Sequence, residues 1–155
     1  MRGYWNQPDA TAKALRPGRR PGETLLYTGD LFRMDPEGFL YFVERMDDII
    51  KTGGEKVAPR RVEEVVAQLP GVAEVAVCGL PDELLGEVIG AVITLTPGAH
   101  VSCEDVQRHC RDHLDAFMVP KIVEVQNALP TTMNGKVSRR ALRAMAMSAA
   151  GVTRP

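Results

Sequence analysis

The stretch VAEVAVCGLPDELLGEVIGAVITL, residues Val72 to Leu95, decides the fold. It contains two apolar runs, VAEVAVCGL and GEVIGAVITL, which are rich in valine and isoleucine. Short apolar runs of this composition indicate buried strands when turn residues bound them. Pro70-Gly71 precedes the first run and Pro97-Gly98 follows the second, so both ends carry a turn signal. We therefore predict two buried strands at the centre of the chain.

Helices are predicted on either side of these strands. Pro59 opens one helix, because proline is favoured in the first helical turn, and its apolar face consists of Val62, Val65, Val66 and Leu69. Ser102 begins another with a Ser-x-x-Asp capping pattern that ends at Asp105. The apolar stripe of this second helix is expected to consist of Val106, Cys110, Leu114 and Phe117.

A third strand and a last helix complete the C-terminal part. KIVEVQ, residues 121–126, has the composition of a strand, and SRRALRAMAM, residues 138–147, that of a helix. From Val57 onward the order is therefore helix, strand, strand, helix, strand, helix. This order predicts a small α+β or α/β domain with a three-stranded sheet covered by helices.

The chain before Asp47 has a different character. A short helix is expected from Asp9 to Leu15. TLLYTGDLFRM, residues 24–34, and FLYFVER, residues 39–45, are strand-like and flank a DPEG turn, so they predict a β-hairpin. This part has little apolar mass of its own. We therefore place a boundary near Asp47, with residues 1–46 and 47–147 as separate parts and 148–155 as a flexible tail.

Composition narrows the classes of function. The 155 residues include 45% hydrophobic and 25% charged residues, which is ordinary for a globular protein, and the net charge of -1 argues against a general nucleic-acid or membrane binder. The three cysteines have no paired spacing, so a disulfide framework is not expected. No apolar run is long enough for a membrane span, and the N-terminus lacks the apolar centre of a signal peptide. We expect a cytoplasmic protein.

Lys136 stands out within LPTTMNGKVSRRAL, residues 129–142, because it follows the turn pair Asn134-Gly135 and precedes a helix. A phosphate-binding Walker loop is excluded, because Pro130 occupies the position of its first glycine and Val137 follows the lysine. A surface turn with a solvated lysine is the simplest interpretation of this motif alone.

Two further segments carry charges in defined places. Asp30 follows a Thr-Gly pair, where it either forms a turn or offers two carboxylate oxygens to a vicinal diol such as a ribose. ERMDDIIKTGGEK, residues 44–56, gathers charges around Gly53-Gly54, a pair that allows a ligand to approach the backbone closely. A solvated connector is the alternative for this second segment, and its pattern does not fit a calcium loop.

His109 and His113 are spaced four residues apart on a predicted helix, which can be a metal-binding spacing. No third ligand is apparent, so we interpret both as exposed helix histidines and predict no metal site. Cys78 is expected to be a small core residue in a strand.

Taken together, three segments closely resemble the C-terminal part of the AMP-forming adenylating enzymes, a superfamily of acyl-CoA synthetases, peptide-synthetase adenylation domains and luciferases. They are YTGDLFRMDPEGFLYFVERMDDIIKTGGEKVAPRRVEEVV, then GLPDELLGEVIGAVITL, then LPTTMNGKVSRRAL. The resemblance covers Gly3 to about Met145. It implies an α+β lid domain after Asp47, and a preceding hairpin that belongs to the large core domain. The segment DDIIKTGGEKVAPRRVEEV is most similar to acyl- or aryl-CoA ligases.

The resemblance also implies roles for individual residues. Asp30 is similar to the acid that holds the ribose hydroxyls, and Arg45 to the arginine near the ribose and phosphate. Asp47 stands at the hinge about which the small domain rotates. Lys136 resembles the adenylation lysine, while Lys51 and Gly53-Gly54 lie on the loop that faces the pantetheine thiol after rotation. Glu44 departs from the pattern, because a glycine usually precedes the arginine.

The implied reaction joins a carboxylic acid to CoA or to the pantetheine of a carrier protein, with ATP as the energy source. ATP or AMP, CoA and Mg²⁺ are the implied cofactors, bound mainly by a large domain whose phosphate loop does not occur in these 155 residues. We therefore expect a fragment, or a separately encoded lid that meets a core domain in trans. A non-catalytic lid or interaction module is the alternative from another class.

Overall fold

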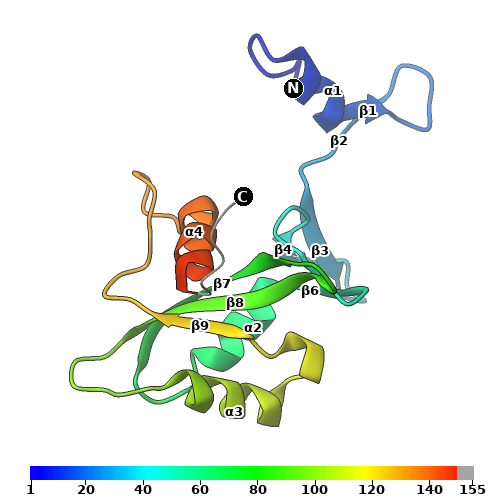
Figure 1. Cartoon of the computed structure of the whole chain (residues 1–155). Coiled ribbons are helices and arrows are strands. Elements are labelled where there is room, and N and C mark those ends of the chain that lie inside the picture. Colours follow the sequence, from blue (N-terminus) through cyan, green and yellow to red (C-terminus); the bar gives the residue numbers. More distant parts are fainter. Residues whose placement is uncertain (150–155) are drawn as a thin grey trace. The chain divides into compact units, whose positions relative to one another are not determined.

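The computed structural model describes residues 1–149, and the chain divides into two compact units, Met1–Asp47 and a second unit that begins at Asp48 (Figure 1). Within the described residues, no helix combines the length and the hydrophobicity needed to cross a membrane. Most of the tail expected at 148–155 lies outside the described residues. Its first two positions, Ser148 and Ala149, still belong to the last helix.

The first unit contains one short helix and two separate pairs of antiparallel strands. Strands β1 and β2 pair with each other, as do β3 and β4, which confirms the predicted hairpin. TLLYTGDLFRM is not one strand, however, because Gly29 turns the chain with a φ of 78°. Asp30 therefore begins a strand of its own, β3. The elements are α1 (Pro8–Ala14), β1 (Leu15–Pro17), β2 (Thr24–Leu26), β3 (Asp30–Met34) and β4 (Leu40–Arg45).

The first unit has almost no core. Of its side chains, only Ala14 and Glu44 are buried. Large apolar residues stay on its surface instead, and Trp5, Phe39 and Leu40 are 95%, 62% and 64% exposed. Apolar surface of this extent stabilises a protein only when something else covers it.

The second unit is built on a five-stranded sheet in which β6, β5, β8 and β7 follow one another and β9 pairs in parallel with β8. The three predicted strands are β7, β8 and β9. The expected strand number is corrected to five, because Gly53-Gly54 closes a tight turn that lets β5 and β6 pair. The elements are β5 (Ile50–Thr52), β6 (Glu55–Val57), α2 (Pro59–Val66), β7 (Val72–Asp82), β8 (Gly86–Leu95), α3 (Cys103–His113), the 3-10 helix η1 (Ala116–Met118), β9 (Ile122–Val125) and α4 (Arg139–Ala149).

Helices cover both faces of this sheet, which confirms the α+β class (Figure 1). Helices α2 and α3 pack on one face, where Val62, Val66 and Val106 are fully buried. Helix α4 packs on the other face through Leu142 and Ala146. A sheet covered on both faces explains why the sequence of β7 and β8 reads as almost continuous apolar runs.

Helix α3 starts as predicted but ends earlier. Ser102 and Asp105 form a complete capping box, in which each side chain accepts a hydrogen bond from the main chain of the other. The helix ends at His113, because Leu114 is already extended. Phe117 lies in the 3-10 helix and is 38% exposed, so its predicted place in the helix stripe is wrong.

Candidate functional site

Asp30 and Arg45 face each other across the β3–β4 hairpin of the first unit. Nη1 of Arg45 lies 2.9 Å from Oδ1 of Asp30, and the two side chains are 47% and 25% exposed. A charged hydrogen bond of this kind restrains the position of the carboxylate. Among the described residues none donates to Oδ2, so this oxygen is available to hydroxyl groups of a ligand.

The surroundings of this pair hold the hairpin in place. Gly29 has a positive φ and its carbonyl accepts a hydrogen bond from the main chain of Met46 at 2.7 Å. A Cβ at Gly29 would lie 3.3 Å from Nη2 of Arg45, so a side chain there would crowd the arginine. Glu44 is buried and its Oε1 accepts the hydrogen bond of the Arg45 N–H at 3.0 Å. Its φ is not positive, so this position does not require the glycine that the resemblance led us to expect.

Lys51 lies in the second unit, on a hairpin formed by β5 and β6. Gly53 and Gly54 have φ values of 57° and 88°, and two positive φ values in a row define the tight turn that suits a two-residue hairpin. The Lys51 N–H donates to Oε2 of Glu87 at 2.8 Å, which ties β5 to the start of β8. The Lys51 side chain is exposed, on a backbone that is held from both sides.

Lys136 lies at the end of a second tight loop in the same unit. Thr131 pairs with Val137 across the loop, and the Thr132 N–H donates to the Lys136 carbonyl at 2.7 Å. The turn is closed by the Gly135 N–H, which donates to the Thr132 carbonyl at 2.9 Å, and Gly135 has a φ of 74°. The predicted turn is confirmed, and its backbone is fixed by three cross-loop contacts.

Helix α4 follows this loop directly. Ser138 caps the helix by accepting a hydrogen bond from the Ala141 N–H at 3.4 Å. The Lys136 side chain is exposed, and in the part of the chain that the structure describes it makes neither a hydrogen bond nor an ion pair. An ammonium group without a partner, carried by a fixed turn, is available to an incoming anion.

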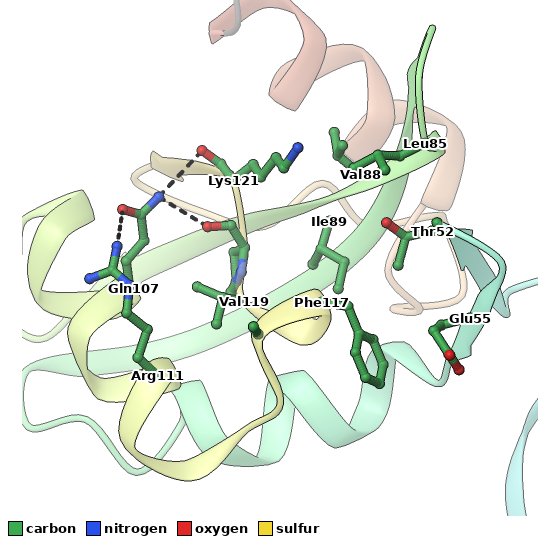
Figure 2. A pocket seen from close by; sticks show the side chains of 13 residues that line it. Thr52, Glu55, Leu85, Val88, Ile89, Gln107, Arg111, Phe117, Val119 and Lys121 are labelled. Carbon is green, nitrogen blue, oxygen red and sulfur yellow. Dashed lines mark hydrogen bonds between the residues drawn. The ribbon is translucent and has the colours of Figure 1, made fainter.

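A pocket of about 360 Å³ opens beside the β5–β6 turn of the second unit (Figure 2). Thr52 and Gly53 contribute to its wall, so it adjoins the hairpin that carries Lys51. Two cationic residues, Arg111 and Lys121, are among those that line it, and Arg111 donates to Oε1 of Gln107 at 3.4 Å. The sequence interpretation missed this pocket, because its wall joins β5, β8, α3 and the segment after it.

The histidines have different environments. His113 is exposed, as expected, whereas His109 is half-buried with its Nε2 3.0 Å from the Val65 carbonyl oxygen. The expectation for His109 is therefore corrected. Cys78 and Cys110 are buried, which confirms Cys78 as a core residue, and burial raises the pKa of each thiol to about 11.

Comparison with known proteins identifies the domain. Residues 61–136 match the family model of the AMP-binding enzyme C-terminal domain. A long-chain-fatty-acid–CoA ligase of Bacillus subtilis (strain 168) is 41% identical over 142 residues, which cover 92% of this chain and 24% of that protein. The chain thus spans about a quarter of the length of the curated relatives that it matches.

Solved structures show the same domain. ATP-bound MatB from Rhodopseudomonas palustris matches with a TM-score of 0.81 and 32% identity, over 92% of this chain and 27% of that one. The amide bond synthetase McbA from Marinactinospora thermotolerans matches with a TM-score of 0.79 and 36% identity, over 93% and 28%. The chain belongs to the family of AMP-binding enzyme C-terminal domains of the adenylating enzymes, as its three sequence motifs indicated.

Proposed function

We propose that the chain supplies the lid of an AMP-forming acid–CoA ligase, together with the hairpin of the large domain that precedes it. The observation that carries this proposal is the pair of exposed lysines, Lys51 and Lys136, on two tight turns of one unit. Such a unit can offer one cation to the first half-reaction and the other to the second. The CoA ligases among the relatives support this assignment.

In the first half-reaction a carboxylate oxygen attacks the α-phosphorus of ATP and pyrophosphate leaves. Two anions must approach each other, and negative charge builds on the phosphate oxygens. Lys136 neutralises this charge, because its compact ammonium group reaches the site on a long stem from a fixed turn. The role proposed for Lys136 therefore requires only that its positive charge lies close to the phosphate.

Asp30 and Arg45 hold the nucleotide in this proposal. Arg45 engages Oδ1 of Asp30 and leaves Oδ2 for the ribose hydroxyls. Arg45 also adds a positive charge near the phosphate. Asp47 is the proposed hinge, and the division of the chain into units immediately after it supports this role.

In the second half-reaction the thiol of CoA loses its proton to water and its sulfur attacks the acyl carbonyl carbon, while AMP leaves with the electron pair of the broken bond between that carbon and the phosphate oxygen. Lys51 and Gly53-Gly54 border the thiol in this proposal. The pocket beside Gly53 supports a role in CoA binding, because Arg111 and Lys121 among its lining residues suit the phosphate groups of that cofactor. Figure 2 shows both side chains at the pocket.

Two further expectations concern Mg²⁺ as a cofactor and the cytoplasm as the compartment. The described residues contain no group of three or more potential metal ligands, and we assign no step to Mg²⁺. We place the protein in the cytoplasm, because its three cysteines are free, as is usual in a reducing compartment.

Two alternatives concern the partner and the acceptor. The chain can act in trans, as a lid or as a non-catalytic module that binds a separate core protein. The acceptor can be the pantetheine of a carrier protein instead of CoA, and the likeness to an amide bond synthetase adds an amine as a third acceptor. These acceptors differ only in the second half-reaction, so assays with each acceptor separate them.

Pyrophosphate exchange with a panel of carboxylic acids tests the proposal. The chain alone should give no exchange, whereas the chain joined to a large adenylating domain should exchange with at least one acid. In that enzyme, Lys136→Ala should reduce exchange by a factor of roughly 100 to 1,000, the effect of removing one transition-state charge. Transfer from a supplied acyl-adenylate should continue. Robust exchange by the chain alone, or equal loss of both steps, would contradict the proposal.

A further inference from the structure

Arg139, the first residue of α4, joins three parts of the second unit. Its Nε lies 3.7 Å from Oδ2 of Asp48, and its Nη1 lies 3.5 Å from Oε1 of Glu63 on α2. The same Nη1 donates a hydrogen bond to the carbonyl of Val77 on β7. The side chain is 34% exposed, and those of Asp48 and Glu63 are 27% and 23% exposed. The guanidinium group is therefore largely enclosed by acceptors, in contrast to a solvated surface arginine.

The contact at Val77 explains why an arginine suits this position. The Val77 N–H donates to Oε1 of Glu63 at 2.9 Å, and its carbonyl accepts from Arg139. The N–H and the carbonyl of Val77 in β7 thus both form hydrogen bonds with side chains, one from α2 and one from α4. Polar groups on the open edge of a strand need partners of this kind. Only the planar fork of arginine reaches a carbonyl and two carboxylates at once.

A second ion pair also connects α4 with the sheet. Arg143 lies one helical turn after Arg139, on the same side of α4, and its Nη2 lies 3.4 Å from Oε1 of Glu87. The other oxygen of Glu87 accepts the N–H of Lys51. A Cβ at Gly79 would lie 2.6 Å from the Glu87 carboxylate, so this glycine leaves the space that Glu87 occupies. The segment from Asp48 to Lys51 is therefore tied to α4 at both ends.

These contacts of Arg139 connect two segments that the proposed mechanism uses, the one behind the hinge and the one that carries Lys136. Asp48 is the first residue of the second unit, directly after the proposed hinge at Asp47. Lys136 lies three residues before Arg139, and the loop between Thr131 and Val137 runs straight into α4. Apart from Arg139, the start of α4 and the loop before it are held by the cap of Ser138, by the cross-loop hydrogen bonds and by the apolar packing of Leu129, Val137 and the helix.

We propose that Arg139 is a positioning residue for Lys136: it fixes the start of α4 to Asp48 and Glu63, so that the Lys136 loop moves as one body with the segment behind the hinge. The inference rests on the proposed function, because it assigns Arg139 a task only in the half-reaction that needs Lys136. Neither Arg139 nor Asp48 touches the reacting atoms.

The kinetic test uses the chain joined to its large domain. Arg139→Ala should lower the rate of adenylation by roughly tenfold to a hundredfold, the cost of misplacing a catalytic group by about 1 Å. Transfer of the acyl group from a supplied acyl-adenylate should stay within about twofold of the unaltered enzyme, the scatter we allow for substitutions distant from the chemistry. Arg140→Ala is the matched control, because Arg140 is exposed and makes no hydrogen bond or ion pair within residues 1–149.

A double substitution separates positioning from a purely structural role. If Arg139 acts through Lys136, then Arg139→Ala should cause no further loss of adenylation in an enzyme that already carries Lys136→Ala. A further loss of the same size, or an equal loss of both half-reactions, would overturn the proposal. Asp48→Asn removes one partner with little change in shape, so it gives the same split if Arg139→Ala does not fold.

Hydrogen exchange on this chain gives a readout without catalysis. Arg139→Ala should raise the exchange rates of the Thr132 and Gly135 amides by roughly tenfold, while amides of β8 keep their rates. Unchanged loop exchange would overturn the proposal. If Lys136→Ala slows adenylation but Arg139→Ala does not, the positioning role of Arg139 is overturned and the role of Lys136 stands. An unimpaired Lys136→Ala enzyme would instead overturn the role of Lys136, and the positioning role with it.

Discussion

Charged side chains of the second unit fall into two groups at the level of single residues. Arg139, Arg143 and Glu87 make ion pairs or hydrogen bonds, whereas the side chains of Lys51 and Lys136 are exposed on turns and make neither among the described residues. Engaged charges fix the backbone, and exposed charges can meet a ligand. Asp30 combines both properties, since Arg45 donates to one carboxylate oxygen and none of the described residues donates to the other.

Asp30→Asn tests the proposed ribose contact. The amide keeps the shape of the side chain but loses the charge that accepts strong hydrogen bonds from Arg45 and from hydroxyl groups. In the enzyme with its large domain, we expect KM for ATP to rise by about tenfold, the equivalent of one such hydrogen bond. The pair is partly exposed, so thermal stability should hardly change. A normal KM for ATP would remove Asp30 from the nucleotide site.

The sequence allowed some of these residues to be found and not others. Asp30, Arg45, Lys51 and Lys136 lie in motifs that can be matched by resemblance, since each motif is continuous in sequence. Arg139 was not recognised, because its acceptor Val77 is 62 residues away and meets it only in the folded unit. Glu87 was missed for the same reason, since it accepts the N–H of a residue 36 positions earlier.

At the level of elements, local patterns predicted the starts of helices better than their ends. The capping box of α3 depends on Ser102 and Asp105 alone, and it is present as predicted. The end of this helix depends on how Leu114 leaves it to pack against the sheet, which the spacing of apolar residues does not encode. Strands β5 and β6 were not counted in the predicted sheet, because each has only three residues.

Ser102→Ala tests the capping box at two pH values. Loss of the cap should lower the free energy of unfolding by about 1 kcal/mol at pH 7, measured by denaturant titration. Hydrogen bonds from Ser102 hold the pKa of Asp105 below its ordinary value of 3.8. A carboxyl with a lowered folded pKa stabilises the fold above its unfolded pKa, and this stabilisation is lost as pH falls through the folded value.

The difference in free energy of unfolding between the unaltered chain and Ser102→Ala should therefore become smaller as the pH is lowered below 3.8. Part of the deficit should persist, because the Asp105 N–H also donates to the Ser102 hydroxyl, a bond that does not depend on the carboxyl charge. Glu104→Gln is a suitable control in the same helical turn. A deficit that widens in acid would show that the carboxyl is not stabilised by the cap.

At the level of the whole molecule, the two units differ in how much apolar surface they bury. The second unit has two apolar layers, one on each face of its sheet. The first unit buries only Ala14 and Glu44 and leaves Phe39, Leu40 and Met34 between 62% and 67% exposed. The sequence predicted this contrast, since the region before Asp47 has little apolar mass that could form a core.

Asp47→Pro tests the proposed hinge. Proline fixes φ near −65° and removes a main-chain donor, so a residue that must change its backbone angles between two orientations cannot do so. In the enzyme with its large domain, the substitution should block one half-reaction and spare the other. Pyrophosphate exchange and acyl transfer from a supplied acyl-adenylate measure the two halves separately. Normal rates in both would exclude Asp47 as the hinge, and Met46→Ala serves as a neighbouring control.

The unequal burial leads to a prediction for the chain by itself. A hairpin without a cover is only marginally stable in water, and its open edges invite pairing with other chains. We therefore expect limited proteolysis to cut first between Arg16 and Asp47 and to leave a resistant C-terminal piece. Amide exchange should be fast before Asp47 and slow in β7, β8 and β9. A large adenylating domain added in trans should slow both the cleavage and the exchange of the first unit. If a proven monomer instead protects residues 1–46 as strongly as β8, the first unit is stable without a core domain. The interpretation of the chain as an independent module would then gain over that of a lid with part of a larger domain.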